Sequence, residues 1–200
     1  MYLFANHGTS SGAVANKCPS GTRCYWTKIW QQDANGVYQF VRDFVPCKKG
    51  DRVGLWDRVS GNIFYPVTGA LTAGSTVTVH ADPDKTLEYV EADGTQYIDT
   101  EVNARSGTKA TAKLVYTESN VSVNDNYGGY VVLGAKGSSN TSYLYMIRRH
   151  YNGSNWRWMT CYGGRYQTLF EDMAKDQMYV LASEITTNGT CKATRNGRNG

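Results

Sequence analysis

The stretch "CYWTKIW" (residues 24–30) alternates along its length in the way expected of a β-strand that is half-buried in a sheet. Turn-forming pairs such as Asn35-Gly36, Asp93-Gly94 and Asn188-Gly189 separate further segments of this kind. These segments are "STVTVHA" (75–81), "KATAKLVYT" (109–117), "TSYLYMI" (141–147), "WRWMTCY" (156–162) and "TCKATRN" (190–196). The one helix-like stretch, "LFEDMAKDQMYVL" (169–181), is better interpreted as a turn that leads into a strand. Short strands at regular spacing predict an all-β sandwich.

Bulk composition narrows the class of protein. The chain has 200 residues, enough for a single buried core, and it is rich in Gly (21) and Tyr (15). Its net charge of +4 is mild and its Lys and Arg are scattered, so we expect no nucleic-acid partner. No run approaches the roughly 20 apolar residues of a membrane span. The opening "MYLFANHG" (1–8) lacks the features of a signal peptide and is expected to be a strand entering a turn.

The five cysteines have no metal-binding spacing. They are Cys18, Cys24, Cys47, Cys161 and Cys191, an odd number, so at least one is unpaired within the chain. Cys18 and Cys24 could close a small loop around "PSGTR", but without a second cluster ordinary thiols are the favoured interpretation.

Two longer stretches carry a resemblance to a known family. "LEYVEADGTQYIDTEV" (87–102) resembles the opening of concanavalin A-like (laminin-G-like) jelly-roll domains, which are common in large surface and phage-associated proteins of gut bacteria. "YQFVRDFVPCKKGDRVGLWDRVSGNIFY" (38–65) is similar to the end of such a domain. Further segments, "VVLGAKGSSNTSYLYM" (131–146) and "NWRWMTCYGGRY" (155–166), look like strands that follow the opening. The chain departs from the family pattern at Trp56, where Tyr is usual, and at Glu101, where Gly is usual.

The order of the two halves is the larger departure. The resemblance makes residues 1–74 the C-terminal part of a jelly-roll domain, residues 75–84 a linker, and residues 85–200 the N-terminal part. The chain is then either a window across a tandem-repeat boundary or a permuted sandwich. A partial jelly roll would expose an apolar face and open strand edges. We therefore expect both parts to form one closed sandwich, with strand exchange between chains as the alternative.

The best candidate for ligand binding is "YNGSNWRWMTCYGGRYQ" (151–167). Trp156 and Trp158 share one face of a predicted strand, and Tyr162, Arg165 and Tyr166 continue the aromatic and basic character into the next turn. Sugars pack their C–H faces on aromatic rings and need polar groups for their hydroxyls. The alternative is that the two tryptophans fill the core.

A weak calcium site is conceivable in "NVSVNDNYGG" (120–129), because laminin-G-like domains often bind Ca²⁺ near their rim. The oxygen donors would come from Asn124, Asp125 and Asn126. Ca²⁺ takes 6–8 oxygen ligands, usually with several carboxylates, so one aspartate leaves an ordinary turn as the favoured interpretation.

No residues are predicted to be catalytic. Glu88 and Glu91 point to opposite faces of a strand, and Asp93 belongs to a turn, so no pair of carboxylates shares a cleft. Asp43 and Asp57 each sit beside an arginine and are interpreted as ion-paired or turn-capping residues.

The expected function is recognition without catalysis. The resemblance implies a module of a bacterial surface or phage-associated adhesive protein that recognises glycan or surface-protein ligands through rim loops. We expect it outside the cell, at the cell surface or on a virion, with no cofactor other than the weak calcium site. The alternative is a structural spacer or self-assembling unit, and a glycoside hydrolase is a more remote one.

Overall fold

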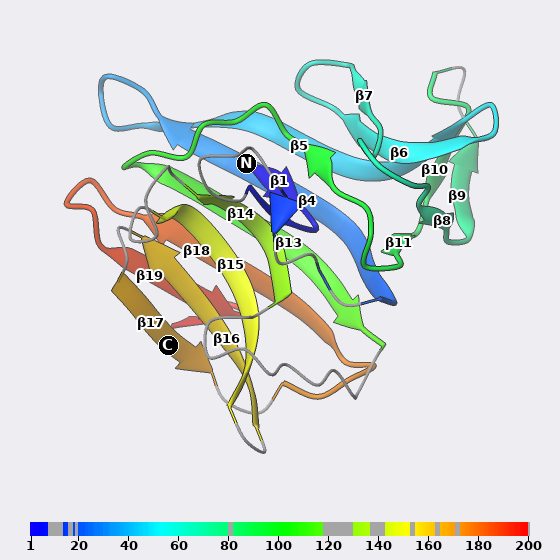
Figure 1. Ribbon diagram of the computed structural model, residues 1–200. Helices are drawn as coiled ribbons and strands as arrows, with labels where there is room; N and C mark the ends of the chain where they lie inside the picture. Colours follow the sequence, from blue (N-terminus) through cyan, green and yellow to red (C-terminus); the bar gives the residue numbers. More distant parts are fainter. Residues whose placement is uncertain are drawn as a thin grey trace.

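A computed structural model describes most of the chain, and all of its regular elements are β-strands that pair in antiparallel fashion. The strands form two stacked sheets and one short hairpin (Figure 1). This confirms the all-β sandwich prediction at the level of fold class. The described residues are 1–7, 14–15, 18, 20–79, 82–117, 130–136, 143–152, 155–162, 165–170 and 173–199.

The large sheet has twelve strands. Its main path runs in the order β20 (Arg198–Asn199), β19 (Cys191–Arg195), β18 (Met178–Ile185), β13 (Thr108–Tyr116), β4 (Thr22–Gln32), β5 (Tyr38–Lys49), β10 (Lys85–Leu87) and β9 (Thr76–Val79). Four strands branch from it: β11 (Val90–Ala92) pairs with β4, β8 (Thr72–Ala73) with β11, β6 (Arg52–Asp57) with β5, and β7 (Ile63–Phe64) with β6.

The small sheet has six strands. Its order is β12 (Ile98–Asp99), β1 (Tyr2–Leu3), β14 (Tyr130–Lys136), β15 (Tyr143–Asn152), β16 (Asn155–Tyr162) and β17 (Arg165–Phe170). The separate hairpin pairs β2 (Asn6–His7) with β3 (Val14–Ala15).

The two halves of the chain pair with one another in both sheets. β1 lies between β12 and β14, so that Tyr2 is opposite Asp99 on one side and Gly134 on the other. β4 lies between β13 on one side and β5 and β11 on the other. Within the predicted linker, residues 76–79 form β9 and pair with β10.

β5 is long because it pairs with three strands along its length, β4, β6 and β10. Its first residues, up to Phe44, pair with β4, and its last residues, from Phe44 onward, pair with β6 on the opposite edge. The turn that opens β5 is the predicted Asn35-Gly36 pair: Gly36 adopts a φ of 78°, and the Asp33 carboxylate accepts the N–H of Asn35 at 2.9 Å. Near its start, β4 pairs with β11 along the same edge that β5 occupies further along the strand, so the large sheet forks at this point.

The core fills the space between the two sheets. Its largest fully buried side chains include Ile29, Phe44, Leu55, Leu114 and Leu133. Burial of each such side chain contributes about 1.5–3 kcal/mol, which makes this layer the main source of stability. The sheets are also tied by a hydrogen bond between the hydroxyls of Thr160 and Ser183, both buried.

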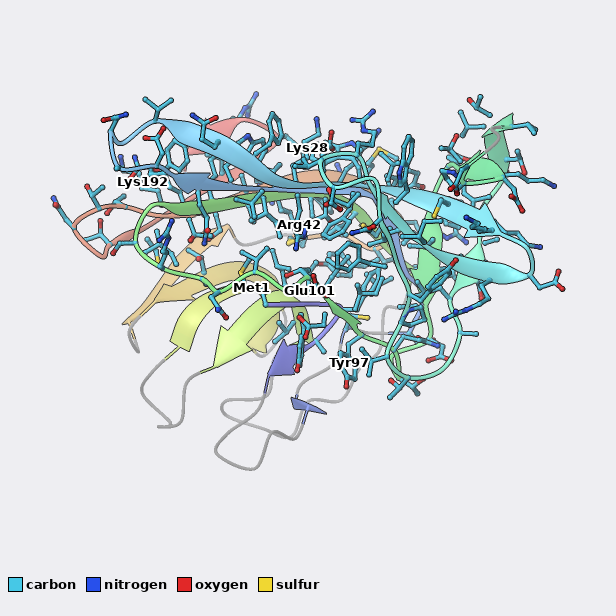
Figure 2. All side chains as sticks on the ribbon, turned by 90° about the horizontal axis from the view of Figure 1, so that it is seen from above. Met1, Lys28, Arg42, Tyr97, Glu101 and Lys192 are labelled. Atoms are coloured by element: carbon cyan, nitrogen blue, oxygen red, sulfur yellow. The ribbon has the colours of Figure 1, made fainter. Side chains whose placement is uncertain are left out.

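A polar cluster joins β5 to the segment after β12. Arg42 Nε donates to the Thr100 carbonyl at 3.0 Å, and Arg42 Nη2 lies 3.4 Å from Glu101 Oε2. Figure 2 shows Arg42 on the side of the large sheet that faces Met1 and Glu101. Asp43 pairs with Arg58 at 2.6 Å, and the buried Asp57 carboxylate accepts hydrogen bonds from backbone N–H groups of its turn. These contacts confirm the expected ion pair and turn cap.

The described cysteine side chains are free thiols. Cys18 and Cys24 are both buried and do not close a loop with one another. Burial raises the pKa of each from 9.0 to about 12, because the thiolate would lose its hydration. Cys47 is buried as well, and its pKa is also raised to about 12.

Candidate functional site

The outer face of the large sheet carries large aromatic side chains in the middle of β4. Trp26, Lys28 and Trp30 are partly exposed, whereas the residues between them, Thr27 and Ile29, are buried. Successive side chains of a strand point to opposite faces, so the two tryptophans and the lysine share the face turned away from the small sheet. Figure 2 shows Lys28 on that side of the large sheet.

We call Trp26, Trp30 and Phe40 the aromatic row. The Phe40 ring, on β5, lies 4.9 Å from the Trp30 ring, and Phe40 is 49% exposed. Lys28 Nζ lies 5.6 Å from the centre of the Trp26 ring and 5.7 Å from that of Phe40. An ammonium group at such distances from ring faces is attracted to their π-electrons, so Lys28 holds the row in place from its middle.

A shallow groove borders the aromatic row. One line of cross-strand partners runs from Trp30 on β4 to Lys109 on β13, Glu184 on β18 and Lys192 on β19. Lys109 Nζ lies 5.5 Å from the Trp30 ring centre and so joins the row to the groove. The groove has a volume of about 260 Å³ and is lined by Lys109, Glu184, Lys192 and small residues that include Thr111, Ala182 and Thr194.

Glu184 is the one carboxylate among the described residues that line the groove. Its Oε1 accepts a hydrogen bond from the Tyr38 hydroxyl at 2.9 Å. Burial, and then the adjacent carboxylate, raise the pKa of Tyr38 to about 12, so the phenol remains a donor.

Aromatic and basic residues continue along β4 toward β11. Lys113 Nζ lies 5.4 Å from the centre of the Tyr25 ring, which in turn lies 5.5 Å from the Tyr89 ring. Arg23 stacks on Tyr89 at 4.8 Å and forms a 2.6 Å ion pair with Glu91. The hydrogen bond to Glu91 raises the pKa of Arg23. Glu91, one of the acidic residues weighed for catalysis, is therefore held by an arginine.

The residues predicted from sequence as a binding site lie in the small sheet. Trp156, Trp158 and Tyr162 belong to β16, Arg165 and Tyr166 to β17, and Tyr162 is opposite Arg165 in the strand pairing. The fold thus brings these five residues into one hairpin, at the edge of the small sheet. Their side chains are not among the described parts of the structure, and their role in binding stays a prediction.

The predicted calcium ligands Asn124, Asp125 and Asn126 lie outside the described residues. In the part of the chain that the structure does describe, no group of three or more His, Cys, Asp or Glu side chains could hold a metal ion.

Sequence reasoning missed the aromatic row and the groove. The signal was present in "CYWTKIW", where Lys28 has the same parity as Trp26 and Trp30. A lysine between two tryptophans of one face shows that this face meets solvent, because an unpaired lysine is almost never buried. The partners Lys109, Glu184 and Lys192 could not be found in this way, since their alignment depends on the register of three strand pairs.

Comparison with known proteins gives no further assignment: no family model, no curated protein and no solved structure matches the chain. Among the described residues, no helix is long and apolar enough to cross a membrane.

Proposed function

We propose that the protein is a non-catalytic module that recognises glycans through the aromatic row and the adjoining groove. The observation that carries this proposal is the alignment of Trp30, Lys109, Glu184 and Lys192 across four strands, with partly exposed aromatic rings on one side. A flat apolar surface next to a strip of hydrogen-bonding groups matches the two sides of a sugar ring.

Each part of the site has a distinct role in this proposal. Trp26, Trp30 and Phe40 offer ring faces to the C–H groups of sugars. Lys109 and Lys192 donate hydrogen bonds to hydroxyl oxygens, and Glu184 accepts from hydroxyl groups. The small side chains of the groove leave room for a chain of sugars to lie across β13, β18 and β19.

The proposed domain type is a concanavalin A-like jelly roll whose C-terminal part precedes its N-terminal part. The interleaving of the halves supports this, because β1 and β4 each lie between strands of the other half. The resemblance of 87–102 and 38–65 to such domains suggests a bacterial surface or phage-associated adhesive protein. Its place would then be extracellular, at the cell surface or on a virion.

The proposal is tested by affinity electrophoresis through gels that contain neutral polysaccharides such as dextran, mannan or a β-glucan. At least one polysaccharide should retard the wild-type protein, and Trp30→Ala should abolish most of the retardation. Tyr65→Ala is the matched control, because Tyr65 is an aromatic residue that stacks on Arg52 at 3.7 Å, away from the row. Equal retardation of Trp30→Ala and the wild type would refute the proposed site.

A second candidate function, self-assembly, is favoured by the edge of the large sheet at which β9 is the last of the described strands. β9 ends the path of this sheet, and its residues Thr76–Val79 carry no charge. Val77 and Val79 are 65% and 71% exposed. Uncharged exposed edges pair readily with other strands, so the partner we propose is β9 of a second copy. Light scattering across a concentration series should then show oligomers that Val79→Lys abolishes; a monomer at every concentration would exclude this candidate.

A further inference from the structure

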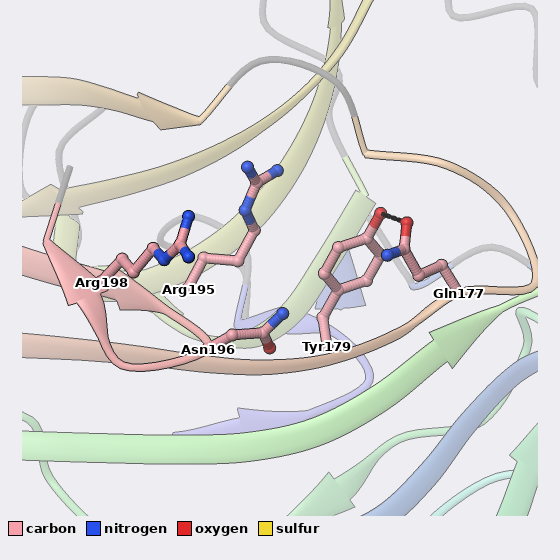
Figure 3. A pocket seen from close by; sticks show the side chains of 5 residues that line it. All are labelled: Gln177, Tyr179, Arg195, Asn196 and Arg198. Atoms are coloured by element: carbon pink, nitrogen blue, oxygen red, sulfur yellow. Dashed lines mark hydrogen bonds between the residues drawn. The ribbon is translucent and has the colours of Figure 1, made fainter.

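A second hollow lies at the margin of the sandwich, away from the aromatic row. Its volume is about 440 Å³, and its described lining is Gln177, Tyr179, Arg195, Asn196 and Arg198 (Figure 3). Tyr179 and Arg195 have the same parity on their strands as the buried residues Leu181 and Ala193. They therefore belong to the face of the large sheet that looks toward the small sheet. We call this space the arginine hollow.

The walls of the arginine hollow are fixed by hydrogen bonds that use their acceptor atoms. The Tyr179 hydroxyl accepts the N–H of Ala174 at 2.8 Å and donates to Gln177 Oε1 at 2.8 Å. Asn196 Oδ1 accepts the N–H of Val180 at 2.8 Å. Both amide oxygens thus accept hydrogen bonds from within the protein. The NH₂ groups of Gln177 and Asn196 are the parts of these side chains that can donate hydrogen bonds to a ligand. Figure 3 shows the nitrogen end of the Asn196 amide turned toward the space between Arg195 and Tyr179.

The hairpin between β19 and β20 places two guanidinium groups in the same hollow. Asn196 and Gly197 form its turn with φ angles of 51° and 78°, the left-handed conformation that Asn and Gly adopt readily in tight hairpins. Arg195 and Arg198 flank this turn and lie opposite each other in the pairing of β19 with β20. Arg195 also lies over the Tyr179 ring, at 5.9 Å from its centre. Arg195 and Arg198 are the two formally charged residues of the described lining.

We propose that the arginine hollow binds an oxyanion carried by an acidic glycan, either a carboxylate or a sulfate group. Guanidinium and amide N–H groups are the donors that such oxyanions prefer, and guanidinium pairs them with strong, directional hydrogen bonds. A neutral hydroxyl would find few acceptors here, because the amide oxygens and the phenol are already bonded. The glycan part of this inference rests on the proposed function, whereas the oxyanion part depends only on the hollow.

The test measures binding of three probes by isothermal titration: sodium sulfate, a galacturonic acid oligosaccharide and a sulfated galactose oligosaccharide. An uncharged galactose oligosaccharide of equal length is the reference ligand. At least one anionic probe should bind the wild-type protein, and comparison of the two oligosaccharides shows whether carboxylate or sulfate is preferred. Arg198→Gln should weaken that binding about tenfold, as expected for the loss of a charge-assisted hydrogen bond.

Two further variants make the result decisive. Gln177→Glu places a carboxylate in the hollow, and should abolish anion binding by repulsion. Lys85→Gln removes one positive charge at an exposed residue of β10, far from the hollow, and should leave binding unchanged. Equal losses in Arg198→Gln and Lys85→Gln, or no binding of any anionic probe, would overturn the inference. Failure of the neutral polysaccharides to bind at the aromatic row would refute the proposed function but not anion binding at the hollow.

Discussion

The two faces of β4 differ in burial, although both carry large apolar side chains. On the inner face, Ile29 is fully buried against the core, while its neighbour Trp30 stands on the outer face beside Phe40 and Lys109. Apolar side chains of β4 therefore have different roles according to the face of the strand on which they lie. The inner face stabilises the sandwich, and the outer face is available to a ligand. Substitutions on the two faces should separate stability from binding.

The largest effect is expected from Ile29→Ala on the inner face. Removal of three buried carbons from the core should lower the free energy of unfolding by about 2–5 kcal/mol. Affinity for a bound polysaccharide should stay unchanged under conditions in which the variant is folded. Urea denaturation followed by circular dichroism measures the first quantity, and affinity electrophoresis the second. A loss below about 0.5 kcal/mol would show that Ile29 is not packed as described.

The buried thiols of Cys18 and Cys24 should make the protein sensitive to alkali. Their pKa is about 12 in the folded chain and 9.0 when unfolded, so only the unfolded state loses the proton as the pH rises through 9. The contribution of the protonated thiols to the free energy of unfolding is therefore fully present well below pH 9 and decreases above it, by about 1 kcal/mol per thiol at pH 10. Urea denaturation at pH 8 and pH 10 measures this loss. Cys24→Ala should reduce it, and an identical loss in that variant would contradict the assignment.

Trp30→Ala on the outer face should lower the affinity for a polysaccharide and leave the stability nearly unchanged, the reverse of what we expect for Ile29→Ala. Because Trp30 is partly exposed, its removal should change stability by less than about 1 kcal/mol. Polysaccharide affinity should fall about tenfold or more through loss of the ring face. Titration calorimetry and urea denaturation of the same sample give both values. A large loss of stability with unchanged affinity would make Trp30 a structural residue.

The smallest effect is expected at the ion pair between Arg23 and Glu91, near the start of β4. Glu91→Gln removes the charge that pairs with Arg23, where both side chains are partly exposed to solvent. Solvent-exposed pairs contribute about 0.2–1 kcal/mol, and this contribution should decrease in 0.5 M salt. Thermal unfolding of the variant at low and high salt measures the difference. A loss of several kcal/mol would indicate that Glu91 has partners beyond Arg23.

The fold class followed from the sequence because alternation and turn residues are local signals. "KATAKLVYT" (109–117) matches β13 (Thr108–Tyr116) to within one residue at each end, and Asn35-Gly36 and Asn188-Gly189 are turns with glycine at positive φ. The fork at Phe44 was not visible, because it depends on β11 taking the edge of β4 that β5 leaves. Which of two distant strands pairs with a given edge of β4 cannot be predicted from the local sequence of β5 or β11.

The candidate site was harder to predict for a related reason. Both "CYWTKIW" and "WRWMTCY" place two tryptophans on one face, and the tryptophans by themselves do not say which face meets solvent. Only Lys28, set between Trp26 and Trp30, distinguishes the first. The neighbours Glu184 and Lys192 reach Trp30 through strand register over more than 150 residues of sequence. Strand pairing between residues so far apart in the sequence cannot be predicted from their residue types.

NMR of the five tryptophans of the chain tests most directly whether a ligand binds on the outer face of the large sheet. Each indole N–H gives one signal, which a single Trp→Phe substitution assigns. On addition of a polysaccharide that retards the protein, the signals of Trp26 and Trp30 should shift while that of Trp56 stays in place. Shifts confined to Trp156 and Trp158 would contradict the account, because they would move the binding site from the outer face of the large sheet to the β16–β17 hairpin.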